Sequence, residues 1–131
     1  MVISISLNRV WGWCKAWLPV ILWASLIFYL SAQPDLRISP DQLMDLLLRK
    51  AAHMTVFGVL FVLFRRALSH HQSWLAILLT VLYALTDEWH QSFIKGRHAD
   101  LKDVFIDFSG CLIAFLLLQL IRIRIAKMRV A

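Results

Sequence analysis

The sequence has little charge for its length. Charged residues make up 17% of its 131 positions, and hydrophobic residues make up 60%. Soluble globular domains contain about 25% charged residues, and a chain of this size cannot bury so much apolar surface by folding on itself. The mean hydropathy of +0.69 agrees. This composition excludes an ordinary soluble enzyme and a disordered tail, and it places the surplus apolar surface against lipid.

Cysteine and the common cofactor motifs are also scarce. The two cysteines, Cys14 and Cys111, cannot form a disulfide framework, and we expect free thiols because both lie in or beside apolar runs. The chain contains no glycine-rich nucleotide-binding motif, no phosphate-binding loop, no paired-cysteine motif and no zinc-protease motif. The net charge of +6 comes from residues that flank apolar runs, so nucleic-acid binding is not expected.

The sequence contains four apolar runs that lack Asp, Glu, Lys and Arg. They are Ala16–Ala32, Ala51–Phe64, Ser73–Thr86 and Phe108–Ile121. Each of the last three runs would form a helix roughly 21 Å long, which is shorter than the ~30 Å bilayer core. The helices that contain these runs must therefore extend into the polar flanks. The pattern predicts an all-α, integral membrane four-helix bundle. Residues 1–131 then form one transmembrane domain, with spans at about 16–33, 46–66, 72–92 and 103–122.

Smaller features fit these spans. Trp11, Trp13, Trp17 and Trp74 lie near the starts of the first and third spans, which is typical of an interfacial aromatic belt. Pro19 falls in the first turn of the first span, where a proline is tolerated. Gly110 and Ala114 form a small-xxx-small pair, which favours close helix packing.

Basic residues are distributed unevenly between the two sides of the predicted bundle. The side that holds both termini and the connection between the second and third spans has eight Lys and Arg residues and no acidic residue. The other side has six basic residues and all eight carboxylates. The positive-inside rule therefore predicts a multi-pass protein of the inner (plasma) membrane whose N- and C-termini are both cytoplasmic.

Polar residues gather at the predicted outer ends of the spans with helical spacing. Ionisable groups within membrane helices are costly and normally face the bundle interior or a wet cavity. We therefore expect one shared, outward-facing vestibule in which residues three, four or seven apart share a helix face. The candidate ligand-binding residues are Lys50, His53, Asp87, Glu88, His90, Gln91, Arg97, Asp103 and Asp107.

These residue types support several kinds of chemistry. Lys50, His53 and Arg97 could bind a phosphate or a carboxylate, arginine through its bidentate fork. Asp87, Asp103 and Asp107 could hold a divalent cation, because calcium and magnesium prefer oxygen ligands. His53 and Asp87 could serve as an acid–base pair in an enzyme. Alternatively, opposite charges pair with each other and lock the helix ends, and His53 is a structural histidine bonded to Asp87 or Asp107.

Two segments resemble the VanZ-like family of teicoplanin-resistance-associated integral membrane proteins. Arg49–Phe57 (RKAAHMTVF) is similar to the family's R-K-x-A-H-F-x-E-Y segment. Asp87–Phe93 (DEWHQSF), Gly96-Arg97 and then Asp103, Asp107 and Gly110 are similar to its D-E-x-x-Q-x-F…G-R…D-V-x-x-[ND]-x-x-G stretch. The resemblance covers about residues 20–120. Val56 and Phe57 stand where the family has glutamate and tyrosine, so a site that needs this glutamate is altered here.

The resemblance implies a four-helix membrane protein, and one family member confers low-level resistance to teicoplanin. The leading hypothesis is a non-enzymatic protein whose vestibule binds an anionic envelope ligand and affects glycopeptide susceptibility. The ligand is a lipid headgroup, a lipid-linked wall precursor or a glycopeptide, and membrane lipids are the expected partners. The alternatives are a hydrolase or transferase acting on a lipid headgroup, against which the missing nucleophile motif counts, and a structural bundle that partners another membrane protein.

Overall fold

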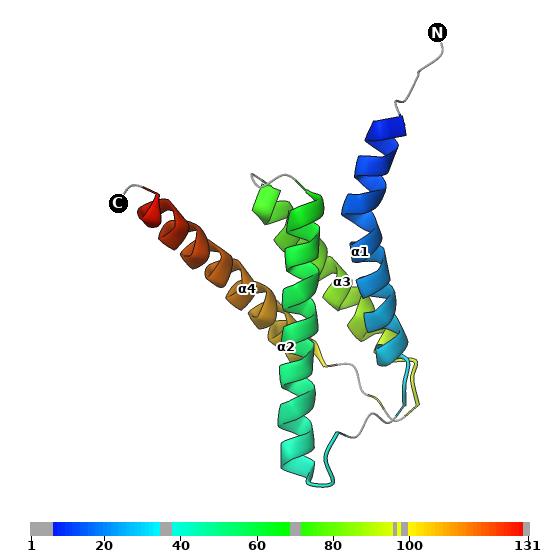
Figure 1. Ribbon diagram of the computed structural model, residues 1–131. Coiled ribbons are helices and arrows are strands. Elements are labelled where there is room, and N and C mark those ends of the chain that lie inside the picture. Colours follow the sequence, from blue (N-terminus) through cyan, green and yellow to red (C-terminus); the bar gives the residue numbers. More distant parts are fainter. Residues whose placement is uncertain (1–6, 35–37, 69–71, 96, 98–99, 130–131) are drawn as a thin grey trace.

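The computed structural model describes residues 7–34, 38–68, 72–95, 97 and 100–129, and this part of the chain contains four helices and no strand (Figure 1). The helices are α1 (Leu7–Ser31), α2 (Gln42–Ala67), α3 (Ser73–Gln91) and α4 (Leu101–Met128). The all-α prediction is thus confirmed. Gly96, one residue of the motif around Arg97, lies outside the described residues.

Three of the helices are long and apolar enough to cross a membrane: residues Arg9–Ser31 of α1, and the whole of α2 and α4. Only 17–22% of each apolar window is buried inside the bundle, so most of these apolar side chains face outward, as in a membrane helical bundle. α3 is not among the three, since it carries Asp87, Glu88 and His90 near its C-terminal end. Its crossing at residues 72–92 stays a prediction.

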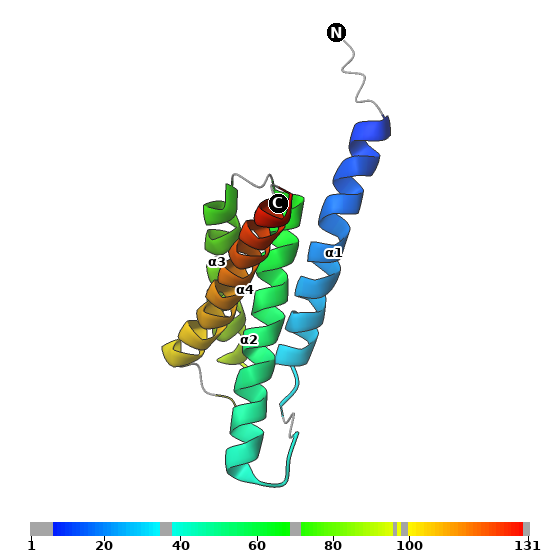
Figure 2. The same ribbon diagram turned by 60° about the vertical axis from the view of Figure 1, so that its left-hand side comes forward.

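The helices alternate in direction around α2 (Figures 1 and 2). α2 packs against each of the other three and most extensively against α4, whereas α1 and α4 share no contact within the described residues. The C-terminal ends of α1 and α3 and the N-terminal ends of α2 and α4 therefore lie at one end of the bundle, which we call the polar end. The N-terminal ends of α1 and α3 and the C-terminal ends of α2 and α4 lie at the other end (Figure 1).

Glycines set the close crossing of α2 and α4. A Cβ added to Gly110 would collide with the backbone carbonyl of Met54, and a Cβ on Gly58 would lie 3.0 Å from the Gly110 carbonyl oxygen. Ala114 packs beside the same point. The sequence identified Gly110 and Ala114 as a packing pair, and the structure adds Gly58 as the residue that faces them.

The start of α1 corrects the expectation for Pro19. The helix begins at Leu7 rather than near residue 16, so Pro19 lies inside it. Proline has no N–H to donate to the carbonyl four residues earlier, which here belongs to Lys15. The Arg66 Nη2 donates to that carbonyl oxygen at 3.3 Å. A side chain of α2 thus satisfies the acceptor that Pro19 leaves free, and the bond also links α1 to α2.

The apolar core is centred on α2. Phe57, Leu60 and Phe61 are fully buried, and the rings of Phe57 and Phe61 contact Tyr83 on α3 and Phe115 on α4. Two further side chains bond to backbone carbonyls of a neighbouring helix: Trp23 Nε1 donates to Val56 at 2.9 Å, and the Tyr83 hydroxyl donates to Ala24. Such bonds fix the register of α1 against α2 and α3, since the donors have no water to bond in an apolar interior. Cys14 and Cys111 are both free thiols, as expected.

We predict that Gly110→Ala destabilises the bundle by about 1–3 kcal/mol, because the added methyl group must push α2 and α4 apart. Gly12→Ala is the matched control: nothing lies within 4 Å of a Cβ at Gly12, and alanine favours a helix over glycine by about 0.5–1 kcal/mol. Thermal unfolding of the detergent-purified variants, followed by circular dichroism, measures both. Equal unfolding temperatures for the two variants would contradict the close crossing.

Candidate functional site

The polar end is where most of the buried polar side chains are found. Helical spacing places each of them on the inward face of its helix, so the four helix ends bring them together. Those with less than a tenth of their surface exposed are Ser31, Asp45, Asp87, Glu88, Gln91 and Asp107. The nine predicted site residues all lie in this region, but the structure divides them into separate contacts.

A chain of hydrogen bonds joins α1, α3 and the following loop. The Ser31 hydroxyl donates to Asp87 Oδ2 at 2.9 Å, and Gln91 Nε2 donates to the same oxygen at 2.8 Å. The side-chain amide oxygen of Gln91, Oε1, then accepts a hydrogen bond from Arg97 Nη1 at 3.0 Å. We call Ser31, Asp87, Gln91 and Arg97 the relay. It holds the guanidinium of Arg97 in a fixed place, since each partner is itself anchored.

Arg97 differs from the neighbouring cations in its pairing. Arg49 forms an ion pair with Asp45 at 2.8 Å, and Lys50 pairs with Asp103 at 3.4 Å. Arg97 forms no ion pair with any residue that the structure describes, and its hydrogen-bond partner among them is the neutral Gln91 side-chain amide. Partial burial lowers the pKa of the Arg97 guanidinium from its ordinary value, while the charge of Asp87 opposes this. The group stays protonated, because an arginine pKa is normally above 12.

His53 on α2 pairs with Asp107 on α4. Its Nδ1 lies 3.1 Å from Asp107 Oδ1, and the Asp107 side chain is 2% exposed against 31% for His53. The histidine ring also stacks on Phe57, with 6.2 Å between ring centroids. Of the two carboxylates considered for His53, the structure therefore places Asp107 beside it. No described residue bonds to Nε2 of His53, so this nitrogen is left for a ligand or water.

Three other predicted residues have structural partners. Lys50 and Asp103 keep 38% and 40% of their side chains exposed, and such a surface pair contributes about 0–1 kcal/mol. Glu88 is buried, and its Oε1 accepts a bond from the backbone N–H of Asp100 at 2.6 Å. Asp100 in turn caps α4 by accepting from Lys102 N. Glu88 therefore fixes the connection between α3 and α4 rather than facing a ligand.

His90 lines a separate cavity of about 340 Å³ between α1 and α3. Its ring stacks on Phe28, with 4.1 Å between the centroids. The lining residues are Phe28, Tyr83, Thr86, Asp87, Trp89, His90 and Phe93. Asp87 Oδ1 and His90 Nδ1 are buried and have no hydrogen-bond partner in the described part of the chain. Lys50, His53, Arg97, Asp103 and Asp107 do not line this cavity, so it is not the single shared vestibule that the sequence predicts.

The carboxylates of the polar end do not form a metal centre among the described residues. No three His, Cys, Asp or Glu side chains in residues 7–34, 38–68, 72–95, 97 and 100–129 come close enough to hold a metal ion. Asp87, Asp103 and Asp107 instead bond to Ser31 and Gln91, to Lys50 and to His53. The residues present therefore do not supply the oxygen cage that a divalent cation would need.

Sequence reasoning gave too little weight to two residues of this region. Ser31 is not among the nine predicted site residues, yet it is buried and bonds to Asp87. Asp45 is not among them either, and it is buried and accepts the backbone N–H of Ile38 at 2.6 Å. The signal for Asp45 was present: an acidic residue in the first turn of a helix is a natural partner for nearby backbone N–H groups.

With this geometry described, the comparison with known families can be stated. The profile of the VanZ/LLP1 family matches residues 16–122. The chain belongs to the VanZ/LLP1 family. The match includes the relay and the His53–Asp107 pair, and it confirms the resemblance seen in the two sequence motifs. No curated protein and no solved structure matches the chain.

We predict that Asp87→Ala destabilises the protein by about 1–3 kcal/mol, because Ser31 and Gln91 would each keep a buried polar group without its acceptor. Asp103→Ala is the control, since it removes the same side chain from an exposed pair and is expected to cost less than about 1 kcal/mol. Unfolding of both variants in detergent gives the comparison. An Asp87→Ala protein as stable as the wild type would show that this carboxylate does not hold the relay together.

Proposed function

We propose that this VanZ/LLP1 protein binds an anionic envelope lipid at its polar end and that Arg97 contacts the anionic group of the headgroup. The observation that carries the proposal is the state of the Arg97 guanidinium. It is half-buried, it is oriented by the relay, and it has no carboxylate partner among the described residues. An oriented arginine without a counter-charge is suited to bidentate binding of a phosphate or carboxylate.

The relay supports ligand binding because it orders the Arg97 side chain before the ligand arrives. A free arginine side chain loses rotamer freedom when it binds a ligand, at a cost of roughly 0.5–1.5 kcal/mol. Arg97 has already lost part of that freedom through its bond to Gln91, and Gln91 is held by Asp87. Only one of the five guanidinium donors bonds to an acceptor within the described part of the chain. The remaining donors give Arg97 the capacity to take both oxygens of an anionic group.

The proposed place of action is the outer leaflet of the inner membrane. The end of the bundle that holds both termini also carries the eight basic residues without an acidic one, which supports cytoplasmic termini. The polar end then faces outward, where anionic phospholipid headgroups and lipid-linked wall precursors are found. An effect on teicoplanin susceptibility would follow from the envelope ligand held there, and a glycopeptide itself is the remaining candidate.

Arg97→Gln tests the headgroup contact. We expect native mass spectrometry of the protein, released from membranes of phosphatidylethanolamine with a minority of phosphatidylglycerol, to show about tenfold less retained phosphatidylglycerol in this variant. That change corresponds to about 1.4 kcal/mol, which is within the range for a lost charge-assisted hydrogen bond.

Lys95→Gln is the matched control, because it removes the same charge two residues away from an exposed side chain. It should retain phosphatidylglycerol as the wild type does. An equal loss in both variants would mean that only the overall charge of the loop attracts the lipid. No loss in either would refute the assignment of Arg97.

A second candidate function is supported by the His53–Asp107 pair. A carboxylate bonded to one ring nitrogen orients a histidine so that the other nitrogen can act as a general base, and Nε2 of His53 has no partner among the described residues. This arrangement would suit hydrolysis or transfer at a lipid headgroup. Ser31 does not serve as its nucleophile in the structure, since the Ser31 hydroxyl donates to Asp87 rather than to a histidine.

His53→Gln separates this candidate from binding alone. An enzyme would lose turnover of a radiolabelled phosphatidylglycerol headgroup in the variant while still retaining the lipid in native mass spectrometry. Glutamine keeps a polar group of similar reach, so the fold should survive. If wild type and variant both leave the lipid intact, the protein binds its ligand without converting it, and the proposal of an enzyme is wrong.

A further inference from the structure

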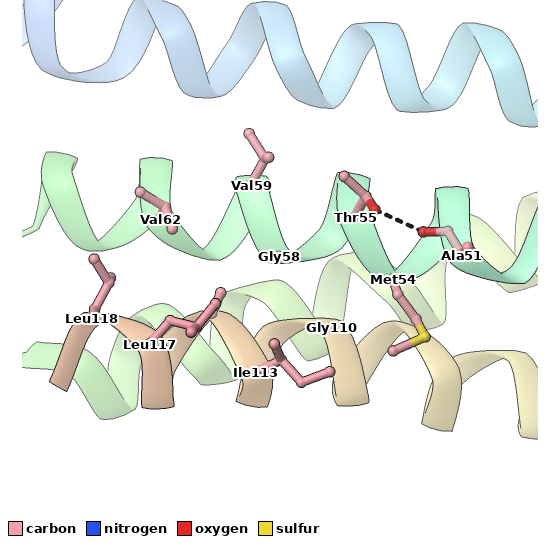
Figure 3. A pocket seen from close by; sticks show the side chains of 11 residues that line it. Ala51, Met54, Thr55, Gly58, Val59, Val62, Gly110, Ile113, Leu117 and Leu118 are labelled. Atoms are coloured by element: carbon pink, nitrogen blue, oxygen red, sulfur yellow. Dashed lines mark hydrogen bonds between the residues drawn. The ribbon is translucent and has the colours of Figure 1, made fainter. Parts of the chain in front are cut away.

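An apolar groove runs along the outer face of the bundle where α2 and α4 cross. It has a volume of about 560 Å³, within the range of small-molecule sites. Figure 3 shows Val59 and Val62 rising from α2 and Ile113 and Leu117 from α4, with Gly58 and Gly110 between them. The missing side chains of the two glycines form the floor of the groove, and the branched side chains form its walls.

The groove offers no free polar group from the side chains that line it. Thr55 is its one hydroxyl-bearing residue, and this hydroxyl donates to the backbone carbonyl of Ala51 at 2.8 Å (Figure 3). All other lining side chains are apolar or are glycine. Because a polar occupant would lose its hydrogen bonds to water without replacement, the chemistry of the walls selects a hydrocarbon.

The length of the groove matches one leaflet of a bilayer. On α2 its lining runs from Ala51 to Val62, and at ~1.5 Å per residue this distance is roughly 17 Å. The hydrocarbon core of a bilayer is ~30 Å thick, so the groove covers about half of it. A transmembrane helix of a second protein would pack along most of the span, whereas a single lipid chain reaches only to the middle.

The outer end of the groove meets the charged residues of the polar end. On α4, Asp103, Gly110 and Leu117 are spaced by seven residues and so share one face of the helix. Asp103 is the partner of Lys50, and that ion pair is partly exposed. Lys50 also directly precedes Ala51, the first lining residue on α2. The Lys50–Asp103 ion pair therefore lies at the end of the groove where the headgroup of a lipid would sit.

We infer that the groove between α2 and α4 holds one acyl chain of the anionic phospholipid whose headgroup lies at the polar end. The inference rests on the proposed function and deepens it, because it identifies the ligand as a membrane lipid with its chain attached. A free glycopeptide or a soluble anion would leave the groove empty. Exposed apolar side chains elsewhere, such as Leu22 on α1, then contact only the ordinary, exchanging lipid.

A photoreactive lipid tests the position of the chain. The probe is phosphatidylglycerol with a diazirine midway along one acyl chain, mixed into vesicles of phosphatidylethanolamine that contain the full-length protein. After irradiation, peptide mass spectrometry should find the label concentrated on Val59, Val62, Ile113 and Leu117. Val62→Trp fills the groove and should lower this labelling about fivefold, which corresponds to about 1 kcal/mol.

Leu22→Trp is the matched control, because it adds the same side chain to an exposed apolar position outside the groove. It should leave groove labelling unchanged. Ile113→Trp fills the groove from α4 and should repeat the effect of Val62→Trp, and circular dichroism establishes that all three variants are folded. Labelling spread evenly over the exposed faces of α1 and α4 would overturn the inference.

The same variants keep the two proposals apart. If Arg97→Gln loses phosphatidylglycerol but Val62→Trp retains it and is labelled like the wild type, the headgroup site stands and the groove assignment is wrong. If groove labelling is equally strong with a phosphatidylethanolamine probe and is unchanged in Arg97→Gln, the headgroup site fails, and so does the anionic identity of the lipid in the groove.

Discussion

The close crossing of α2 and α4 is the constraint on which the arrangement of this protein depends. Gly58 and Gly110 allow the two backbones to meet near Met54. That contact brings His53 within reach of Asp107 and Lys50 within reach of Asp103. It also leaves a groove on the lipid-facing side, because two positions there have no side chain. One backbone contact thus determines both the polar pairs and the apolar groove.

The polar end shows how a mostly apolar bundle tolerates its charges. Buried carboxylates have donors: Asp87 accepts from Ser31 and Gln91 through Oδ2, although its Oδ1 has no partner among the described residues, and Glu88 accepts from a backbone N–H. In a region of low dielectric a satisfied polar network is rigid, and an unsatisfied one is costly. Arg97 stands out against this background, because its neighbours have charged partners and it has a neutral one.

Composition and periodicity were enough to predict the four helices, the polar end and the residues that gather there. Charge-free runs mark helices regardless of tertiary detail, and helical spacing puts residues on one face. The first span is predicted to begin at about residue 16, because the charged residues Arg9 and Lys15 interrupt the apolar run before it. The helix α1 nevertheless begins at Leu7, since a helix readily continues through such residues at an interface. The partner of His53 was not decided, since spacing along one helix does not say which neighbouring helix it meets.

Residue spacing alone also could not decide whether the polar residues line a single shared vestibule. Whether polar faces enclose one space depends on how far the helix ends are tilted apart, and α4 leans away from α1 so that the two do not touch. The groove between α2 and α4 could not be predicted from the sequence for the same reason. It depends on how α2 and α4 cross, and a one-dimensional pattern holds no information about the angle between two helices.

The shortness of α3 has a consequence for the lipid around it. Its charge-free part, Ser73–Thr86, covers roughly 21 Å, while the hydrocarbon core is ~30 Å thick. If α3 crosses the bilayer, its charge-free part is shorter than the hydrocarbon core, and the leaflets beside it must thin at a modest cost per ångström of mismatch. Thinning on this side would draw the surrounding headgroups inward, toward the level of Asp87 and Arg97. The protein would then act on the shape of the surrounding membrane.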